Sequence, residues 1–157
     1  MNSFCFLGYH LDWPNLIAGL ILGLFGGYLI HVVYHWRQGA AKARNLCSKY
    51  GKLARTYSNF RADGVPTGGS VRLVQNQDGS FEVVGFHANG SVDWKSLLWM
   101  DEKYDNRGIT YYLHEAGQGY GVQIIRYLPE QDILQVKGVR ESPGPPLEFF
   151  HTWRPKT

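Results

Sequence analysis

Arginine and aromatic residues recur together in the part of the chain that follows residue 53. Arginine forks bind phosphate oxygens in pairs, and aromatic faces stack on nucleobases. Three arginines lie within runs rich in Val, Ile, Tyr, Phe and Trp, which is the combination that a cyclic nucleotide site needs. The predicted ligand-binding residues are Arg72, Tyr111, Tyr120, Arg126, Trp153 and Arg154.

A structural interpretation of the same residues is also open. The arginines can pair with acidic residues on the solvent face of a sheet, and the aromatic rings, Trp94 among them, can belong to an ordinary core. The acidic candidates are Glu82, Glu115 and Glu148.

Motifs of the common enzyme classes are missing from the sequence. It contains no G-x-x-x-x-G-K-[ST], H-E-x-x-H, G-x-S-x-G or dinucleotide-binding fingerprint. The glycine cluster at 117–121 separates two strand-like runs, so a turn explains it better than a phosphate loop. We therefore expect a protein that is not an enzyme and that has no cofactor.

His31 and His35 are four residues apart, but two imidazoles supply only half of a tetrahedral metal shell. No metal site is predicted from them. A place at a membrane interface suits both rings, and in an oligomer they can alternatively line a pore.

Eight short strands are predicted from β-branched and aromatic runs between turn-forming residues. Turn formers such as Asp78-Gly79, Asn89-Gly90 and Pro129–Asp132 join consecutive runs as hairpins. An up-and-down antiparallel barrel closes eight such strands without an exposed edge, and a two-sheet sandwich is the alternative. The runs are 54–60, 70–76, 80–87, 91–99, 109–116, 120–128, 132–139 and 147–154.

Both faces of some runs carry apolar side chains. In 120–127, the face with Val122 and Ile124 is as apolar as the face with Ile125 and Tyr127. Either part of the barrel exterior is covered, or the interior accepts something polar.

A 19-residue segment, 16–34, contains no acidic or basic residue and is flanked by Trp13 and Trp36. At about 1.5 Å per residue it spans a bilayer core, so a transmembrane helix is predicted over 16–36. No basic residue precedes it, which argues against a cleaved signal peptide. The spacing of Gly19, Gly23 and Gly27 predicts an oligomerisation ridge, although glycine is frequent in membrane helices generally.

Charge is distributed unevenly along the chain. Residues 1–36 contain one acid and no base, whereas 37–64 contain seven bases and one acid. The positive-inside rule then places the short outer tail 1–15 outside and the remainder in the cytosol. We expect an inner-membrane protein with a basic helical stalk at 37–52 and a barrel domain at 53–157. The stalk either packs on a partner stalk or lies along the membrane, where its bases favour lipid headgroups. The barrel part is slightly acidic, which argues against binding of long nucleic acids.

The runs GSVRLVQNQDGSFEVVGF and GYGVQIIRY, following an N-terminal membrane segment, resemble the membrane-anchored, lipocalin-like β-barrel effectors of bacterial cyclic-oligonucleotide antiphage signalling. Those effectors carry two membrane helices, and this sequence shows one. The resemblance implies that a nucleotide second messenger binds the cytosolic barrel, that subunits assemble, and that the membrane is breached. It assigns no ligand residue.

A constitutive lipid-binding or scaffold barrel is the alternative function. The barrel interior distinguishes the two, because a nucleotide needs polar groups and arginine, a fatty acid needs an apolar cavity, and a scaffold is filled.

Overall fold

The computed structural model describes residues 4–6, 9–11, 13–114, 119–141 and 145–156. The chain forms two compact units, Met1–Ala41 and Lys42–Thr157.

The first unit is dominated by a helix. Strands β1 (Phe4–Phe6) and β2 (Tyr9–Leu11) form an antiparallel pair, and helix α1 (Trp13–Tyr50) follows. Its apolar part has a mean hydropathy of 2.2, so by length and composition it could cross a membrane. The helix exposes the three predicted ridge glycines, Gly19, Gly23 and Gly27, and a Cβ added to any of them would have no described neighbour within 4 Å. Their role in oligomerisation stays a prediction.

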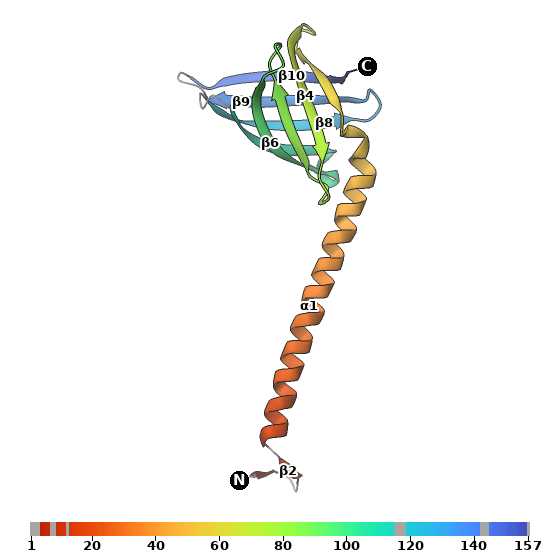
Figure 1. The fold of residues 1–157 in the computed structure, drawn as a ribbon, viewed down its shortest axis with the longest axis vertical. Helices are drawn as coiled ribbons and strands as arrows, with labels where there is room; N and C mark the ends of the chain where they lie inside the picture. The colour runs from red at the N-terminus through yellow and green to blue at the C-terminus, as the bar shows by residue number, and fades with distance from the viewer. Residues whose placement is uncertain (1–3, 7–8, 12, 115–118, 142–144, 157) are drawn as a thin grey trace. The chain divides into compact units, whose positions relative to one another are not determined.

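The second unit is a closed barrel of eight antiparallel strands in the order β10-β3-β4-β5-β6-β7-β8-β9 (Figure 1). This confirms the predicted up-and-down barrel and excludes the sandwich. Every neighbouring pair is consecutive in sequence except β10 and β3, which close the barrel. The strands are β3 (Thr56–Arg61), β4 (Pro66–Gln75), β5 (Phe81–Phe86), β6 (Val92–Asp101), β7 (Arg107–His114), β8 (Tyr120–Leu128), β9 (Ile133–Glu141) and β10 (Leu147–Pro155).

Short turns fix the register of the hairpins. In the β4–β5 turn, Asp78 accepts hydrogen bonds from the backbone N–H and the hydroxyl of Ser80, and Gly79 adopts a positive φ of 86°. In the β5–β6 turn, Asn89 accepts from Ser91 in the same way. Both turns were predicted from their Asp-Gly and Asn-Gly pairs.

One end of the barrel is plugged by the chain that enters it. The last turns of α1 and the 3-10 helix η1 (Gly51–Leu53) bring Tyr50 and Leu53 into the barrel, where both are fully buried. Leu53 packs in the core with Phe81 and Leu98, and complete burial of such a side chain stabilises the fold by about 1.5–3 kcal/mol. Leu46 lies against the β4–β5 turn, close enough that a Cβ on Gly79 would be 2.7 Å from its own.

Candidate functional site

The half of the barrel interior opposite the plug contains a cavity of about 210 Å³. Its walls come from the ends of the strands farthest from Tyr50: the last residues of β7 and β9 and the first of β6 and β10. The lining residues are Asn59, Asp93, Trp94, Tyr112, His114, Gln123, Arg140, Leu147, Phe149, His151 and Trp153. The barrel therefore has a filled half and a half that can hold a small guest.

Aromatic rings form the walls of this cavity. The indoles of Trp94 and Trp153 are stacked with centroids 6.2 Å apart, and Tyr112 lies 5.3 Å from Trp94 and 6.5 Å from Phe149. Four adjacent rings present flat faces and edges to a guest, which suits a planar ligand better than a flexible chain.

Glycines on the neighbouring strands make room for three of these rings. Gly85, Gly121 and Gly138 are the cross-strand partners of Trp94, Tyr112 and Phe149, respectively. A Cβ on each glycine would lie 2.2–2.4 Å from an atom of its partner ring. Each ring is thus held over a bare stretch of backbone, and a side chain at the glycine would drive it out of position.

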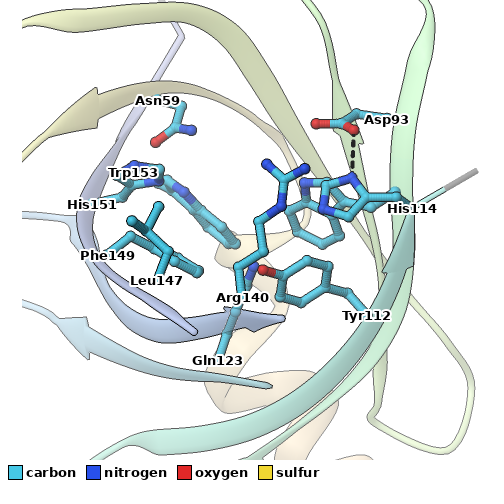
Figure 2. A pocket seen from close by; sticks show the side chains of 11 residues that line it. Asn59, Asp93, Tyr112, His114, Gln123, Arg140, Leu147, Phe149, His151 and Trp153 are labelled. Carbon is cyan, nitrogen blue, oxygen red and sulfur yellow. Dashed lines mark hydrogen bonds and ion pairs between the residues drawn. The ribbon is translucent and has the colours of Figure 1, made fainter. Parts of the chain in front are cut away.

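Arg140 brings positive charge into the cavity. Its guanidinium reaches the middle of the ring of lining side chains (Figure 2), and it forms no ion pair with any residue that the structure describes. An arginine fork in a half-enclosed, aromatic site is a strong binding group for phosphate or carboxylate.

Unpartnered polar atoms also gather here. Within the described part of the chain, five lining residues have a buried polar atom without a hydrogen-bond partner: Asn59 Oδ1, His114 Nε2, Gln123 Oε1, Arg140 Nε and Trp153 Nε1. Such atoms each cost about 1–3 kcal/mol unless an occupant of the cavity hydrogen-bonds them. The set contains acceptors and donors, so a guest with both kinds of group matches it.

His114 is oriented by Asp93. The two side chains are joined by a 2.7 Å hydrogen bond between His114 Nδ1 and Asp93 Oδ1 (Figure 2). Because the carboxylate accepts, Nδ1 carries the proton, and Nε2 is left buried without a hydrogen-bond partner among the described residues. The lining residues include no Ser, Thr or Cys that this pair could activate as a nucleophile.

Burial changes the protonation behaviour of two lining residues. Desolvation lowers the pKa of His151, and the nearby charge of Arg61 lowers it further. Desolvation raises the pKa of the Tyr112 hydroxyl, against the opposing effect of Arg140. His151 is therefore neutral, and Tyr112 is a hydrogen-bonding phenol, at neutral pH.

The six residues predicted to bind a ligand do not converge on one site. Trp153 lines the cavity, whereas Tyr111 and Tyr120 are exposed on the outer face of the barrel. Arg72 and Arg154 are also exposed, with their guanidinium groups over the rings of Phe86 and Phe60. Arg126 pairs with Asp105. Ligand binding by these five outer residues stays a prediction.

The alternative acidic partners are separated from these arginines in the described structure. Glu82 and Glu148 form no ion pair with a described arginine, and Glu115 lies outside the described residues.

Strand alternation contained a partial signal for the cavity residues that were missed. In β7, Thr110, Tyr112 and His114 point inward, and Ile109, Tyr111 and Leu113 point outward. The outward-facing residues are more apolar than the inward-facing ones. This reverses the usual alternation of apolar residues inside and polar residues outside, so the pattern alone does not identify the inward-facing polar residues. A glycine directly across from an aromatic residue, as for Trp94, Tyr112 and Phe149, is the clearer indicator, because it can be recognised once the strand register is known.

Comparisons of the chain with protein-family models, curated proteins and solved structures gave no match.

Proposed function

We propose that this protein is a membrane-anchored effector whose barrel cavity binds a nucleotide, of the cyclic-oligonucleotide class that the sequence resemblance implies. The observation that supports this most is the convergence of Arg140, four aromatic rings and five unpartnered polar atoms on one cavity. Ring stacking suits a nucleobase, the donors and acceptors suit its edge, and the arginine suits a phosphate.

The cavity volume limits how such a ligand binds. About 210 Å³ is below the roughly 300–1,000 Å³ typical of pockets for complete small ligands. We therefore place one nucleobase inside and the remainder of the cyclic ligand across the mouth. Arg61 lies at that mouth as the cross-strand partner of His151, and it supplies positive charge there.

A fatty acid fits this interior less well. It would need a long apolar channel, whereas the plug fills one half of the barrel and polar atoms line the other. The scaffold alternative requires a filled barrel, and it gives no role to Arg140.

In this proposal, ligand binding affects the membrane helix through the plugged end of the barrel. Tyr50 and Leu53 join α1 to the barrel core, so a change in barrel packing on ligand binding acts directly on the end of the helix. We place the helix in the inner membrane with the barrel in the cytosol, and we propose that ligand binding leads to oligomerisation and disruption of that membrane. The barrel is nonenzymatic in this account.

Thermal denaturation of the full chain in detergent tests the proposal. Cyclic di-, tri- and tetranucleotides are added singly, with the matching linear nucleotides as controls. A ligand at about 100 times its dissociation constant stabilises by roughly 2.7 kcal/mol, which is a shift of several degrees for a domain of this size. Unchanged melting across all cyclic nucleotides would contradict the proposal.

A further inference from the structure

The unpartnered polar atoms of the cavity are of two kinds. Among the residues that the structure describes, three of these atoms are acceptors and two are donors. The acceptors are Asn59 Oδ1, His114 Nε2 and Gln123 Oε1, and the donors are Arg140 Nε and Trp153 Nε1. A base that pairs with all five atoms must therefore bring three N–H groups and two acceptors.

The hydrogen bond to Asp93 makes His114 an acceptor toward any further partner. Nδ1 carries the proton in this 2.7 Å bond, so Nε2 of the neutral ring keeps a free lone pair. The side chain is 10% exposed, and Nε2 has no partner among the described residues. An N–H group of a guest is the partner that this nitrogen lacks.

Gln123 is oriented by Tyr112. Burial raises the pKa of the Tyr112 hydroxyl, and Arg140 and a hydrogen bond with Gln123 oppose that rise. A hydrogen bond lowers the pKa of a phenol when it is donated to the phenol oxygen, so the amide nitrogen of Gln123 is the donor. Oε1 of Gln123 is left as the acceptor, in a residue that is 3% exposed.

Asn59 supplies the third acceptor from β3. It is the cross-strand partner of Trp153, so an amide oxygen and an indole N–H that both lack partners lie on neighbouring strands. The pairing of β3 with β4 shifts its register here, between Ser58 and Phe60. Such irregularities re-aim side chains beside binding sites, and Asn59 lines the cavity (Figure 2). The wall thus presents an acceptor next to a donor.

The two donors need no assignment of protonation. An indole Nε1 and a guanidinium have no acceptor function, so Trp153 and Arg140 can only donate. Nε is the atom of Arg140 that is buried and unpartnered. It can serve a base while the terminal nitrogens bind the phosphate of the proposed function.

Guanine is the base whose hydrogen-bonding groups match this set. In a nucleotide it carries three N–H groups, one at N1 and two on the exocyclic N2, and it accepts at O6 and N7. Adenine and cytosine carry two N–H groups and uracil carries one, so each leaves at least one buried acceptor unpaired. Polar sites reject an analogue strongly when a buried group loses its partner in this way.

The sugar determines which edge of the base enters first. N9 carries the sugar, and the remainder of the ligand lies across the mouth in the proposed function. N1–H and O6, on the opposite edge, then point inward. The most buried of the five residues are Gln123 and Trp153, and they offer one acceptor and one donor to that edge. The N2 amino group is left for Asn59 and His114, and N7 for Arg140.

We propose that the cavity selects guanine, and that Asn59 is a specificity-determining residue that accepts a hydrogen bond from the N2 amino group. This inference rests on the proposed function and deepens it by naming the base. Adenine and uracil ligands can bind the same cavity, but with unpaired groups on its wall.

Calorimetric titration of the full chain in detergent tests the selectivity. Cyclic oligonucleotides of each ring size are compared, with guanine, hypoxanthine, adenine or uracil as every base. Hypoxanthine is guanine without the N2 amino group, so its ligand should bind at least tenfold more weakly than the guanine ligand, as should the adenine and uracil ligands. A smaller difference for any of the three would overturn guanine selectivity and leave the nucleotide site standing. Absence of binding throughout would overturn both.

Variants of Asn59 test its role through the ratio of the guanine and hypoxanthine affinities. Asn59→Leu removes the acceptor and should reduce this ratio at least fivefold, whereas Asn59→Asp keeps an acceptor oxygen and should stay within twofold of wild type. Asn45→Leu, at an exposed position on α1, is the control. Melting temperatures verify that each variant folds. An unchanged ratio in Asn59→Leu would overturn the role of this residue, because a general loss of stability affects both ligands alike.

Discussion

The hydroxyl of Tyr50 donates a 2.8 Å hydrogen bond to Oδ1 of Asn106, joining the last residue of α1 to the β6–β7 connection. Tyr50 is 1% exposed, so this contact lies where the helix plugs the barrel. Tyr50→Phe should destabilise the full chain by about 1 kcal/mol through loss of one hydrogen bond, and Tyr50→Ala by about 3–5 kcal/mol through a cavity as well. Denaturant unfolding measures both. Tyr104→Phe, at an exposed position, is the control, and an equal loss there would contradict a specific role for Tyr50.

Asp132 stabilises the same end of the barrel in a pH-dependent way. It lies 2.5 Å from Arg55, and the hydrogen bond from that guanidinium lowers the pKa of Asp132. A lowered carboxyl pKa adds stability that is complete above the unfolded value near 3.8 and is lost as pH falls through the folded value. Asp132→Asn should therefore cost about 0.5–1 kcal/mol at pH 7, since the pair is partly exposed, and progressively less as pH falls below the unfolded pKa. Glu130→Gln is the control for loss of a negative charge in the same turn. A loss of stability in Asp132→Asn that does not change with pH would contradict this prediction.

His151 should make the barrel sensitive to mild acid. Burial lowers its pKa below the ordinary value of 6.5, so the unfolded chain binds this proton more readily than the folded one. Stability due to neutral His151 is present above pH 6.5 and is lost as pH falls from there toward the folded pKa. His151→Gln should show a smaller loss between pH 7 and pH 5 than wild type. Above pH 7.5 the difference between the two proteins should be constant, and parallel curves down to pH 5 would contradict the prediction.

Gly121 should be required for the position of Tyr112. A Cβ at this residue would lie 2.4 Å from the Tyr112 hydroxyl oxygen, so Gly121→Ala must displace the ring. We expect a loss of about 1–3 kcal/mol from overpacking, together with weaker ligand binding. Gly39→Ala is the matched control, because it has no described neighbour within 4 Å and improves helix propensity by up to about 1 kcal/mol. Equal stability of Gly121→Ala and wild type would show that the ring is not held over this glycine.

Sequence patterns predicted the barrel well because its strands are short, consecutive and separated by strong turn formers. Asp78-Gly79 and Asn89-Gly90 each produce the local turn geometry expected of them. Alternation also separated Gln123 and Ile125 from Val122 and Ile124 in β8 correctly.

The site was harder to predict because side-chain direction depends on register across strands. Tyr111 and Tyr112 are adjacent in sequence, yet one is exposed and the other lines the cavity. Arg140 lies near the end of β9, beyond the predicted run 132–139, so the predicted strand does not include it. Apolar side chains on the outer face of the barrel further blurred the distinction between inside and outside, since Leu113 is exposed and the side chain of His114 is only 10% exposed.

Binding of cyclic oligonucleotides to arginine variants of the full chain, measured by calorimetry in detergent, tests the central claim most directly. The ligand is the one that raises the melting temperature of wild type. Arg140→Gln should weaken binding at least tenfold, or about 1.4 kcal/mol, through loss of the charged fork. Arg72→Gln and Arg154→Gln, on the outer face, should stay within twofold of wild type. Loss of binding in the outer variants with Arg140→Gln unaffected would contradict the cavity as the nucleotide site.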